Sequence, residues 1–247
     1  MTLRNKVAIV TGASRGIGKA ITTQLSQQGV TVIGVYNKSI QAANELENTL
    51  NKKEKLVTLV QGEVSDRNFV QQLVKNTIQE YGAIDFLINN AGINRDSISF
   101  KMSEKDWNDV IETNFIGTYN FCSETIPYMV NEKKGHVVNM SSVTGVVGRE
   151  AQTNYAASKG AIIGLTKLFS RMYASYGINI NTIAPGMIKT EMLSSIPEQK
   201  LENFERYTST KCLGTVEQVA RAVILLISDE NSYFNNTVFK LDGGFLR

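Results

Sequence analysis

The sequence predicts an α/β fold in which one domain forms a three-layer sandwich, with a doubly wound parallel sheet of about seven strands between two layers of helices. Short β-branched runs alternate with longer amphipathic stretches along the whole chain of 247 residues. Strands separated by helices of this length form parallel βαβ units. The strands also read as continuous apolar runs, such as Val7-Ala8-Ile9-Val10. That pattern is expected when helices cover both faces of a sheet.

Each element follows from these two patterns. The apolar, β-branched runs predict strands at Val7–Thr11, Val30–Tyr36, Leu56–Gln61, Ile84–Asn89, Gly135–Ser141, Ile178–Ala184 and Val238–Leu241. The amphipathic stretches between them predict helices that include Gly18–Gln28, Asp66–Tyr81, Ser103–Asn131, Ala151–Tyr176 and Val216–Ser228. No linker rich in Pro, Gly or Ser and no internal repeat divides the chain, so residues 1–247 are predicted to form one domain.

The least regular stretch runs from about residue 188 to 214 and mixes Ser, Glu and Lys with Pro197. A long segment without regular structure in a compact domain is usually functional. We therefore expect a substrate lid near residues 188–214.

Composition limits the classes of function. Hydrophobic residues make up 42% and charged residues 20% of the chain, which is typical of a globular protein. The net charge of +3 is small and no dense Lys/Arg run occurs, so no nucleic-acid partner is expected. Two cysteines cannot form a disulfide framework, and Cys122, among apolar residues, is expected to be a buried free thiol.

Neither a metal site nor a membrane segment is expected. His136 is the single histidine, and no cluster of Cys and His accompanies it. The N-terminus runs directly into the first predicted strand, so no signal peptide is expected, and no apolar run has transmembrane length. The expected location is cytoplasmic.

A glycine-rich turn follows the first predicted strand and leads into the first helix. Glycines let the backbone turn sharply and approach a ligand, and the free N–H groups at the start of a helix attract a pyrophosphate. Glycines also close ordinary strand–helix turns, but the position at the first junction of a βαβ pattern favours a Rossmann-type dinucleotide site. The expected contacts are Gly12, Ser14, Arg15, Gly16, Ile17 and Gly18.

The second predicted strand indicates which dinucleotide binds. An NAD site places a carboxylate after this strand to accept a hydrogen bond from the ribose 2′-hydroxyl. Here the strand ends in Tyr36-Asn37-Lys38-Ser39, without an acid. Lys38, together with Arg15 in the glycine loop, would attract a 2′-phosphate, so NADP(H) is the predicted cofactor, with Asn37 and Lys38 as contacts. The alternative is that Lys38 is only a solvated turn residue.

Tyr155 and Lys159 lie four residues apart in a predicted helix and therefore share one face. An ammonium beside a phenol is expected to lower the phenol's pKa from near 10 toward the working pH, so that the phenol can protonate a developing alkoxide. Ser142, after a predicted strand, can hold the carbonyl oxygen. Asn114, in a long helical stretch, can open the helix locally and relay protons through water.

The chain holds a second Tyr-x-x-x-Lys, at Tyr207 and Lys211, and Ser194 stands thirteen residues before that tyrosine, as Ser142 does before Tyr155. The first copy is favoured because its serine follows an apolar strand and its tyrosine opens an apolar helix. The second copy falls in the predicted lid.

Taken in order, these motifs resemble the short-chain dehydrogenase/reductase family over essentially the whole chain. The motifs are Thr11-Gly12-x-x-x-Gly16-x-Gly18, Asn89-Asn90-Ala91-Gly92, Asn114, Ser142, Tyr155-x-x-x-Lys159 and Pro185-Gly186. The resemblance implies a seven-stranded parallel sheet, a nicotinamide cofactor, and a catalytic tetrad of Asn114, Ser142, Tyr155 and Lys159. It implies further cofactor contacts at Glu63, Val64, Asn90, Ala91, Gly92, Tyr155, Lys159, Pro185, Gly186, Ile188 and Thr190.

Within that family the chain is most similar to the 3-oxoacyl-[acyl-carrier-protein] reductases, through such segments as Gly92–Asp96, Trp107–Val110 and Gln152–Tyr155. This similarity implies NADPH-dependent reduction of a 3-oxoacyl thioester, linked to an acyl carrier protein, to the (3R)-hydroxyacyl thioester. It also implies a homotetramer.

Three segments depart from the family's pattern. Glu63 replaces the usual Asp beside the adenine, and Asn235-Asn236 replaces the usual Thr-Gly before the last strand. Tyr176 stands where carrier-protein reductases often have a basic residue, which leaves Lys133 and Lys134 as candidate docking charges.

Two other hypotheses remain open. The chain can be an NADPH-dependent enzyme of the same family that acts on another ketone or alcohol in a specialised pathway, with the lid setting the substrate. It can also be a non-catalytic dinucleotide-binding regulator. The complete set of four catalytic residue types disfavours the regulator.

Overall fold

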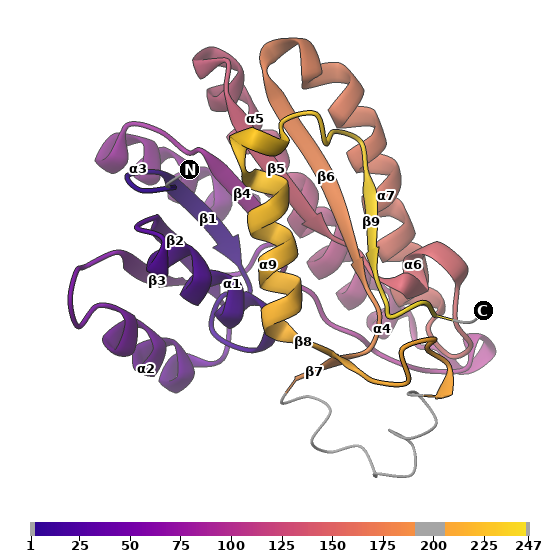
Figure 1. The fold of residues 1–247 in the computed structure, drawn as a ribbon. Coiled ribbons are helices and arrows are strands. Elements are labelled where there is room, and N and C mark those ends of the chain that lie inside the picture. Colours follow the sequence, from indigo (N-terminus) through magenta and orange to yellow (C-terminus); the bar gives the residue numbers. More distant parts are fainter. Residues whose placement is uncertain (1–2, 191–205, 246–247) are drawn as a thin grey trace.

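The computed structural model describes residues 3–190 and 206–245. Seven parallel strands form the central sheet in the order β3-β2-β1-β4-β5-β6-β9 (Figure 1). Their bounds are β1 (Val7–Thr11), β2 (Thr31–Tyr36), β3 (Val57–Gln61), β4 (Phe86–Asn89), β5 (Gly135–Met140), β6 (Ile178–Pro185) and β9 (Val238–Leu241). The predicted doubly wound parallel sheet is therefore confirmed. Strand order reverses between β1 and β4, the position at which ligands bind in open α/β sheets.

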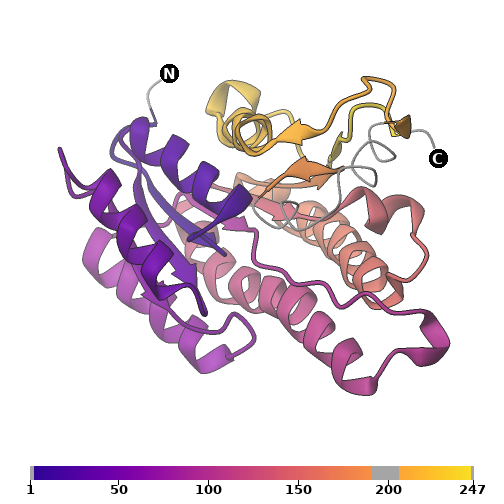
Figure 2. The same ribbon diagram turned by 90° about the horizontal axis from the view of Figure 1, so that it is seen from below.

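Helices cover both faces of the sheet, as predicted. Figure 2 shows α1 and α9 above the strands and α5 and α7 below them. The α-helices are α1 (Gly16–Gln27), α2 (Ile40–Leu50), α3 (Arg67–Tyr81), α4 (Glu104–Ile111), α5 (Gly117–Glu132), α6 (Val143–Val147), α7 (Thr153–Tyr173) and α9 (Val216–Ile227). Short 3₁₀ turns occur at Ser99–Lys101, Ala174–Tyr176 and Asp229–Asn231.

Two hydrophobic cores result, one on each face. Along β1 the side chains alternate: Ala8 and Val10 join the core with α1 and α9, whereas Val7 and Ile9 join the core with α3 and α5. This alternation is the period of two that a strand imposes. Burial on both faces explains why the strand sequences are apolar throughout.

Local sequence signals set several helix ends. The Asp66 carboxylate accepts hydrogen bonds from the N–H groups of Asn68 and Phe69 at the start of α3 (2.9 and 3.3 Å), and Gly82 ends that helix in the left-handed conformation. Thr215 and Gln218 form a capping box at the start of α9. Such caps satisfy N–H groups that the first helical turn leaves unpaired.

The predicted helix from Ser103 to Asn131 is interrupted. A five-residue π-helical segment, Glu112–Ile116, separates α4 from α5. The wider turn changes the direction in which Asn114 points, and hydrophobic periodicity does not reveal such a change. π-Helical turns are rare and frequently mark functional sites.

Two short strands that the sequence did not indicate lie at the two ends of the segment predicted as a lid, residues 188–214. β7 (Ile188–Lys189) pairs in parallel with β8 (Gly214–Thr215) in a separate small sheet. Residues 191–205, including Ser194 and Pro197, lie outside the described residues, so the lid stays a prediction.

Cys122 is a buried free thiol, as predicted, and Cys212 is exposed. Burial raises the pKa of the Cys122 thiol to about 12. Within residues 3–190 and 206–245 no helix combines the length and apolarity needed to span a bilayer. The same residues place no three His, Cys, Asp or Glu side chains where they could hold a metal ion together.

Candidate active site

The carboxyl ends of β1 and β4 are tied together at the switch point. The Thr11 hydroxyl accepts hydrogen bonds from the N–H groups of Asn90 and Ala91, both at 2.9 Å. The Asn90 side-chain amide in turn donates to the Thr11 carbonyl at 2.9 Å. These bonds fix the loop after β4 against the glycine turn.

The glycine turn has no room for a side chain at Gly12 or at Gly18. Gly12 has φ +67°, and a Cβ on it would lie 3.0 Å from the Cα of Ala91. A Cβ on Gly18 would collide with the Gly12 carbonyl oxygen. Arg15 is the N-cap of α1, makes no side-chain capping bond, and no acid occupies the first turn. An uncapped helix start beside a glycine turn fits a pyrophosphate.

The other predicted residues of this loop take different positions. Ser14 is buried, Arg15 is exposed, and Ile17 packs against the core of α1 and α9. Gly16 has φ +52°, and its nearest neighbour across the turn is the Thr190 side chain, 3.7 Å from the position of a Cβ. The turn after β1 therefore faces the segment after β6.

At the end of β2, Asn37 and Lys38 are exposed, and the Asn37 side-chain amide donates to the Glu63 carboxylate at 3.2 Å. Gln61 donates to the Asn37 carbonyl at 2.8 Å. The structure thus brings an acid from the end of β3 beside Asn37, although no acid follows β2 in the sequence. Val64, next to Glu63, is buried against α5.

The segment after β6 joins the site from the opposite side. Pro185 ends β6, and the Gly186 N–H donates to the Leu241 carbonyl at 2.9 Å. Ile188 is buried in the core of α1 and α9. The segment after β6 thus borders the same edge of the sheet as the glycine turn, through Pro185, Gly186, Ile188 and Thr190.

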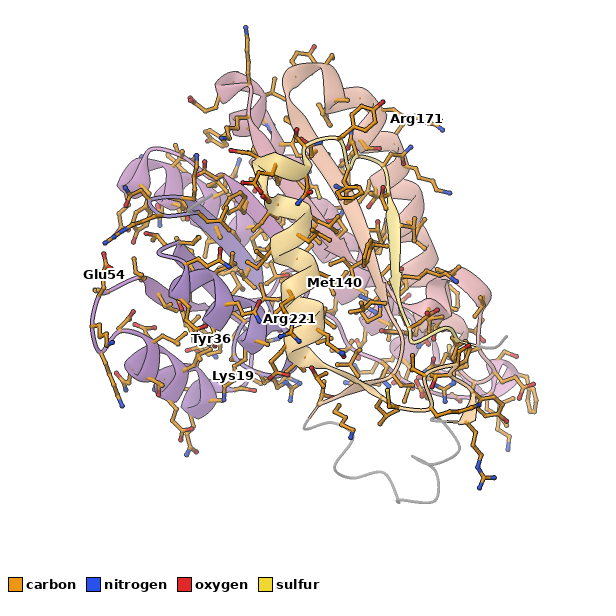
Figure 3. The ribbon with its side chains drawn as sticks, in the orientation of Figure 1. Lys19, Tyr36, Glu54, Met140, Arg171 and Arg221 are labelled. Carbon is orange, nitrogen blue, oxygen red and sulfur yellow. The ribbon has the colours of Figure 1, made fainter. Side chains whose placement is uncertain are left out.

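Tyr155 and Lys159 lie one turn apart on α7. The Lys159 ammonium lies 5.7 Å from the centre of the Tyr155 ring and donates a hydrogen bond to the Met140 carbonyl at 2.8 Å. The side chain of Met140 packs in the core with α9 (Figure 3). Its backbone carbonyl accepts the hydrogen bond from Lys159.

The pKa values of this pair correct one expectation. Burial raises the pKa of Tyr155 above its usual 10, and this outweighs the lowering by its hydrogen-bond partner, the Ser142 hydroxyl. Lys159 is directed to Met140 rather than to the phenol oxygen, so the expected lowering of the phenol pKa is not found. Burial instead lowers the pKa of Lys159 to about 8.

Asn114 is fully buried in the π-helical segment, and its side chain is bonded on both sides. Its amide oxygen accepts from the Ile93 N–H at 2.8 Å, and its amide nitrogen donates to the Ile93 carbonyl and to the Ser158 hydroxyl, both at 3.0 Å. A Cβ on Gly92 would lie 3.2 Å from Asn114 Oδ1 and 3.3 Å from Lys159 Nζ. Gly92 therefore lies between two members of the predicted tetrad.

Ser142 follows β5 and is the N-cap of α6, where its hydroxyl accepts from the Thr144 N–H at 3.1 Å. The structure thus brings Asn114, Ser142, Tyr155 and Lys159 together from α7, the end of β5 and the π segment.

Two residues that sequence reasoning did not assign contribute to this arrangement. The Ser158 hydroxyl donates to the Tyr155 carbonyl at 2.8 Å and connects α7 to Asn114. Gln152 is buried at the start of α7 and contacts Asp96 and Thr144. The available signal in the sequence was a hydroxyl or amide side chain within three residues of Tyr155, the predicted general acid.

The second Tyr-x-x-x-Lys has a different geometry. Tyr207 is 47% exposed. Lys211 has φ +53°, outside the helical region, and its ammonium donates to the Arg206 carbonyl. The two side chains therefore do not share a helix face. Ser194 lies outside the described residues.

The candidate docking charges lie far from this site. Lys133 and Lys134 immediately precede β5, whereas Ser142 follows it, and a six-residue strand spans about 20 Å. Lys134 also forms an ion pair with Asp229 at 2.9 Å.

Comparison with known proteins agrees with these features. Residues 6–201 match the short chain dehydrogenase family. A 3-oxoacyl-[acyl-carrier-protein] reductase FabG of Thermotoga maritima is 39% identical over 249 residues, covering 100% of both chains. The protein of the same name from Chlamydia trachomatis serovar D is 39% identical, covering 98% of each chain, and that from Staphylococcus aureus (strain Mu50) is 36% identical, covering 97% of each.

Proposed function

This chain belongs to the short-chain dehydrogenase family, and from that starting point we propose that it reduces a 3-oxoacyl thioester to the (3R)-hydroxyacyl thioester with NADPH, with Tyr155 as the general acid. The family places it among oxidoreductases that act between CH–OH and C=O and use nicotinamide dinucleotides. The observation that carries the proposal is the pair of Tyr155, which is partly buried, and Lys159, which is buried, beside Asn114 and Gly92.

NADP(H) fits the residues present. The tight glycine turn and the uncapped start of α1 suit the pyrophosphate, and Arg15 and Lys38 are exposed cations that suit a 2′-phosphate. Asn90, Ala91 and the segment after β6 would border the nicotinamide half. When bound, the cofactor supplies the hydride for the carbonyl carbon.

Tyr155 supplies the proton. Its pKa is raised by burial, so the phenol is protonated at neutral pH and can donate to the oxygen that becomes negative as the carbonyl carbon is reduced. The Ser142 hydroxyl can donate a hydrogen bond to the same oxygen and stabilise that charge. In this reaction the carbonyl carbon receives a hydride from the cofactor, and the carbonyl oxygen receives a proton from Tyr155.

Lys159 restores the proton to Tyr155. With a pKa of about 8, its ammonium can give up a proton near neutral pH more readily than an exposed lysine. The Met140 carbonyl holds the ammonium in place, and Gly92 leaves room for it beside Asn114. In this proposal Asn114 shapes the proton path through its bonds to Ile93 and Ser158.

The 3-oxoacyl thioester is proposed because the relatives that align over nearly the whole chain carry that activity in their names. The acyl carrier protein is the proposed carrier of the substrate. One observation favours a second candidate, reduction of another ketone without a carrier protein: Lys134, a candidate docking charge, is paired with Asp229.

A homotetramer is the proposed assembly. The outer faces of α5 and α7, which lie side by side in Figure 2, expose large apolar side chains. These are Tyr119, Tyr128, Leu168, Met172 and, just beyond α7, Tyr176. Contact between copies of the chain would bury them.

One assay tests the function. NADPH and NADH oxidation are followed with acetoacetyl thioesters, acyl-carrier thioesters and plain ketones, using the wild type and Tyr155→Phe. The proposal expects turnover of the thioesters with NADPH and a loss of about a thousandfold in Tyr155→Phe. Turnover of free ketones alone selects the second candidate. Tight NADPH binding without any turnover rejects an enzymatic role.

A further inference from the structure

Gln152 uses both ends of its side-chain amide. Its nitrogen lies 3.0 and 3.2 Å from the two carboxylate oxygens of Asp96 and donates to them. Its oxygen accepts from the Thr144 hydroxyl at 3.2 Å. Only 7% of Gln152 is exposed, and it is the N-cap of α7. One side chain therefore joins the loop after β4, helix α6 and the start of α7.

The hydrogen bonds of Gln152 lead through Thr144 to Ser142, and the chain leads from Gln152 to Tyr155. Thr144, which donates to Gln152, also donates its N–H to the Ser142 hydroxyl. Tyr155 lies three residues after Gln152 on the same helix.

The backbone beside Gln152 is held under strain. The Ser97 N–H donates to the Ala151 carbonyl at 2.8 Å. Ala151 has φ +61°, a left-handed conformation that costs energy in a non-glycine residue and persists only where its surroundings impose it. The loop after β4 thus fixes the segment between α6 and α7 through backbone and side-chain bonds together.

We propose that Gln152 is a positioning residue, which holds the Ser142 hydroxyl and the Tyr155 phenol at working distance through its bond to Asp96. The inference rests on the proposed function, because it assumes that Ser142 and Tyr155 act on a carbonyl oxygen. Gln152 itself needs no contact with substrate or cofactor for this role.

The charges around Tyr155 allow the role to be tested by pH. The Lys159 ammonium on α7 lies 5.7 Å from the centre of the Tyr155 ring, and the Asp96 carboxylate in the loop after β4 acts on the phenol through its charge. The N-cap of α6 contributes the uncharged Ser142 hydroxyl. The Asp96 charge raises the pKa of Tyr155. A second negative charge at position 152 would raise it further.

The decisive experiment exchanges the amide of Gln152 with the carboxylate of Asp96. Gln152→Glu sets two carboxylates against each other and is expected to lower kcat at least about tenfold, with the NADPH Kd changed less than about twofold. Adding Asp96→Asn reverses the direction of the bond, since the new amide donates to the new carboxylate. The double variant is expected to return kcat to within about threefold of the wild type.

A matched control makes the same change elsewhere. Gln72 on α3 also donates its amide to a neighbouring side chain, Asn76, at 2.6 Å, on an exposed surface. Gln72→Glu is expected to leave kcat and its pH profile unchanged. Asp96→Ala provides a second way to remove the bond without adding a charge, and it should lower kcat in the same direction as Gln152→Glu.

Amide hydrogen exchange over residues 142–155 gives a readout that does not depend on turnover. Exchange should speed up in Gln152→Glu and in Asp96→Ala and slow again in the exchanged pair. Wild-type kcat and exchange in both single variants, or an exchanged pair no better than Gln152→Glu, would overturn the inference. If the wild type reduces only plain ketones, the proposed thioester substrate fails, and the same variants assayed on that ketone still decide the role of Gln152.

Discussion

Lys159 passes the ring of Tyr155 at 5.7 Å and ends on the carbonyl of Met140, 2.8 Å from that oxygen. The buried ammonium thus donates to a backbone carbonyl at the end of β5 and not to the phenol oxygen. Burial lowers the pKa of Lys159 to about 8 and raises the pKa of Tyr155 above its usual 10. Lys159 therefore loses its proton at a lower pH than Tyr155, whereas an exposed lysine loses its proton at a higher pH than an exposed tyrosine.

The first prediction concerns the pH dependence of carbonyl reduction. Tyr155 stays protonated to above pH 10, whereas Lys159 loses its proton near pH 8. We expect kcat for reduction to fall above about pH 8, because the proton that restores Tyr155 is no longer available. Stopped-flow measurement of NADPH oxidation from pH 6 to 10 checks this. In Lys159→Met the activity should be low and the decline near pH 8 absent; a decline that persists there would assign it to another group.

The second prediction concerns stability. The pKa of Lys159 is about 8 in the folded chain against 10.5 for an ordinary lysine, so between these values the unfolded chain binds more protons. The free energy of unfolding should therefore rise with pH over this range, with a contribution from Lys159 of up to about 3 kcal/mol. That contribution is lost as the pH falls through 8. Urea unfolding at pH 7.5 and 9.5 should show a smaller rise in Lys159→Met than in the wild type; equal rises would contradict the assigned pKa.

The sequence predicted the layers and the sheet because these depend on the side chains of each segment alone. Val7–Val10 is apolar throughout since both faces of β1 are covered. Predicted strands began up to two residues early, as at Ile84, whose strand starts at Phe86. Ile84 is buried but lies before the first paired residue, with Asp85 between them, so a buried apolar side chain does not mark where pairing begins.

What the sequence did not reveal depends on contacts between distant segments. The two-residue strands β7 and β8 exist only because they pair with each other. The π-helical turn at Asn114 depends on bonds to Ile93, and the lowered pKa of Lys159 depends on burial. The sequence brought forward the four residues of the predicted tetrad through their motifs, but it did not reveal the direction of the pKa shifts of Tyr155 and Lys159.

The third prediction concerns the space around Gly92. A methyl group there would lie 3.2 Å from Asn114 Oδ1 and 3.3 Å from Lys159 Nζ, closer than ordinary contacts, so one of these groups must move. Gly92→Ala should lower kcat about tenfold with little change in thermal stability. Gly160→Ala is the matched control, since its methyl group would find only the Gly145 carbonyl, at an ordinary 3.5 Å. Equal kcat values in the two variants would show that Gly92 does not need to be small.

The fourth prediction concerns the choice of dinucleotide. Lys38 is exposed at the end of β2 beside Asn37, and its charge is proposed to contact a 2′-phosphate. Lys38→Ala should weaken NADPH binding about tenfold and leave NADH binding unchanged, because only NADPH carries that phosphate. Fluorescence titration with both cofactors measures this. Lys52→Ala, another exposed lysine just beyond α2, is the control. A wild type that prefers NADH would show that Glu63, beside Asn37, controls the site instead.

The fifth prediction concerns assembly. Leu168 and Met172 lie one turn apart on α7 and are 55% and 48% exposed, next to Tyr176 at 47%. A charge placed in an apolar contact between subunits must be desolvated without a partner, which costs several kcal/mol and favours dissociation. Leu168→Glu should therefore reduce the molar mass measured by light scattering. Ile40→Glu adds the same charge to an equally exposed apolar residue at the start of α2 and should leave the mass unchanged. A wild type that is a monomer in solution would contradict the tetramer. The exposed apolar side chains of Leu168, Met172 and Tyr176 would then be expected to contact another partner.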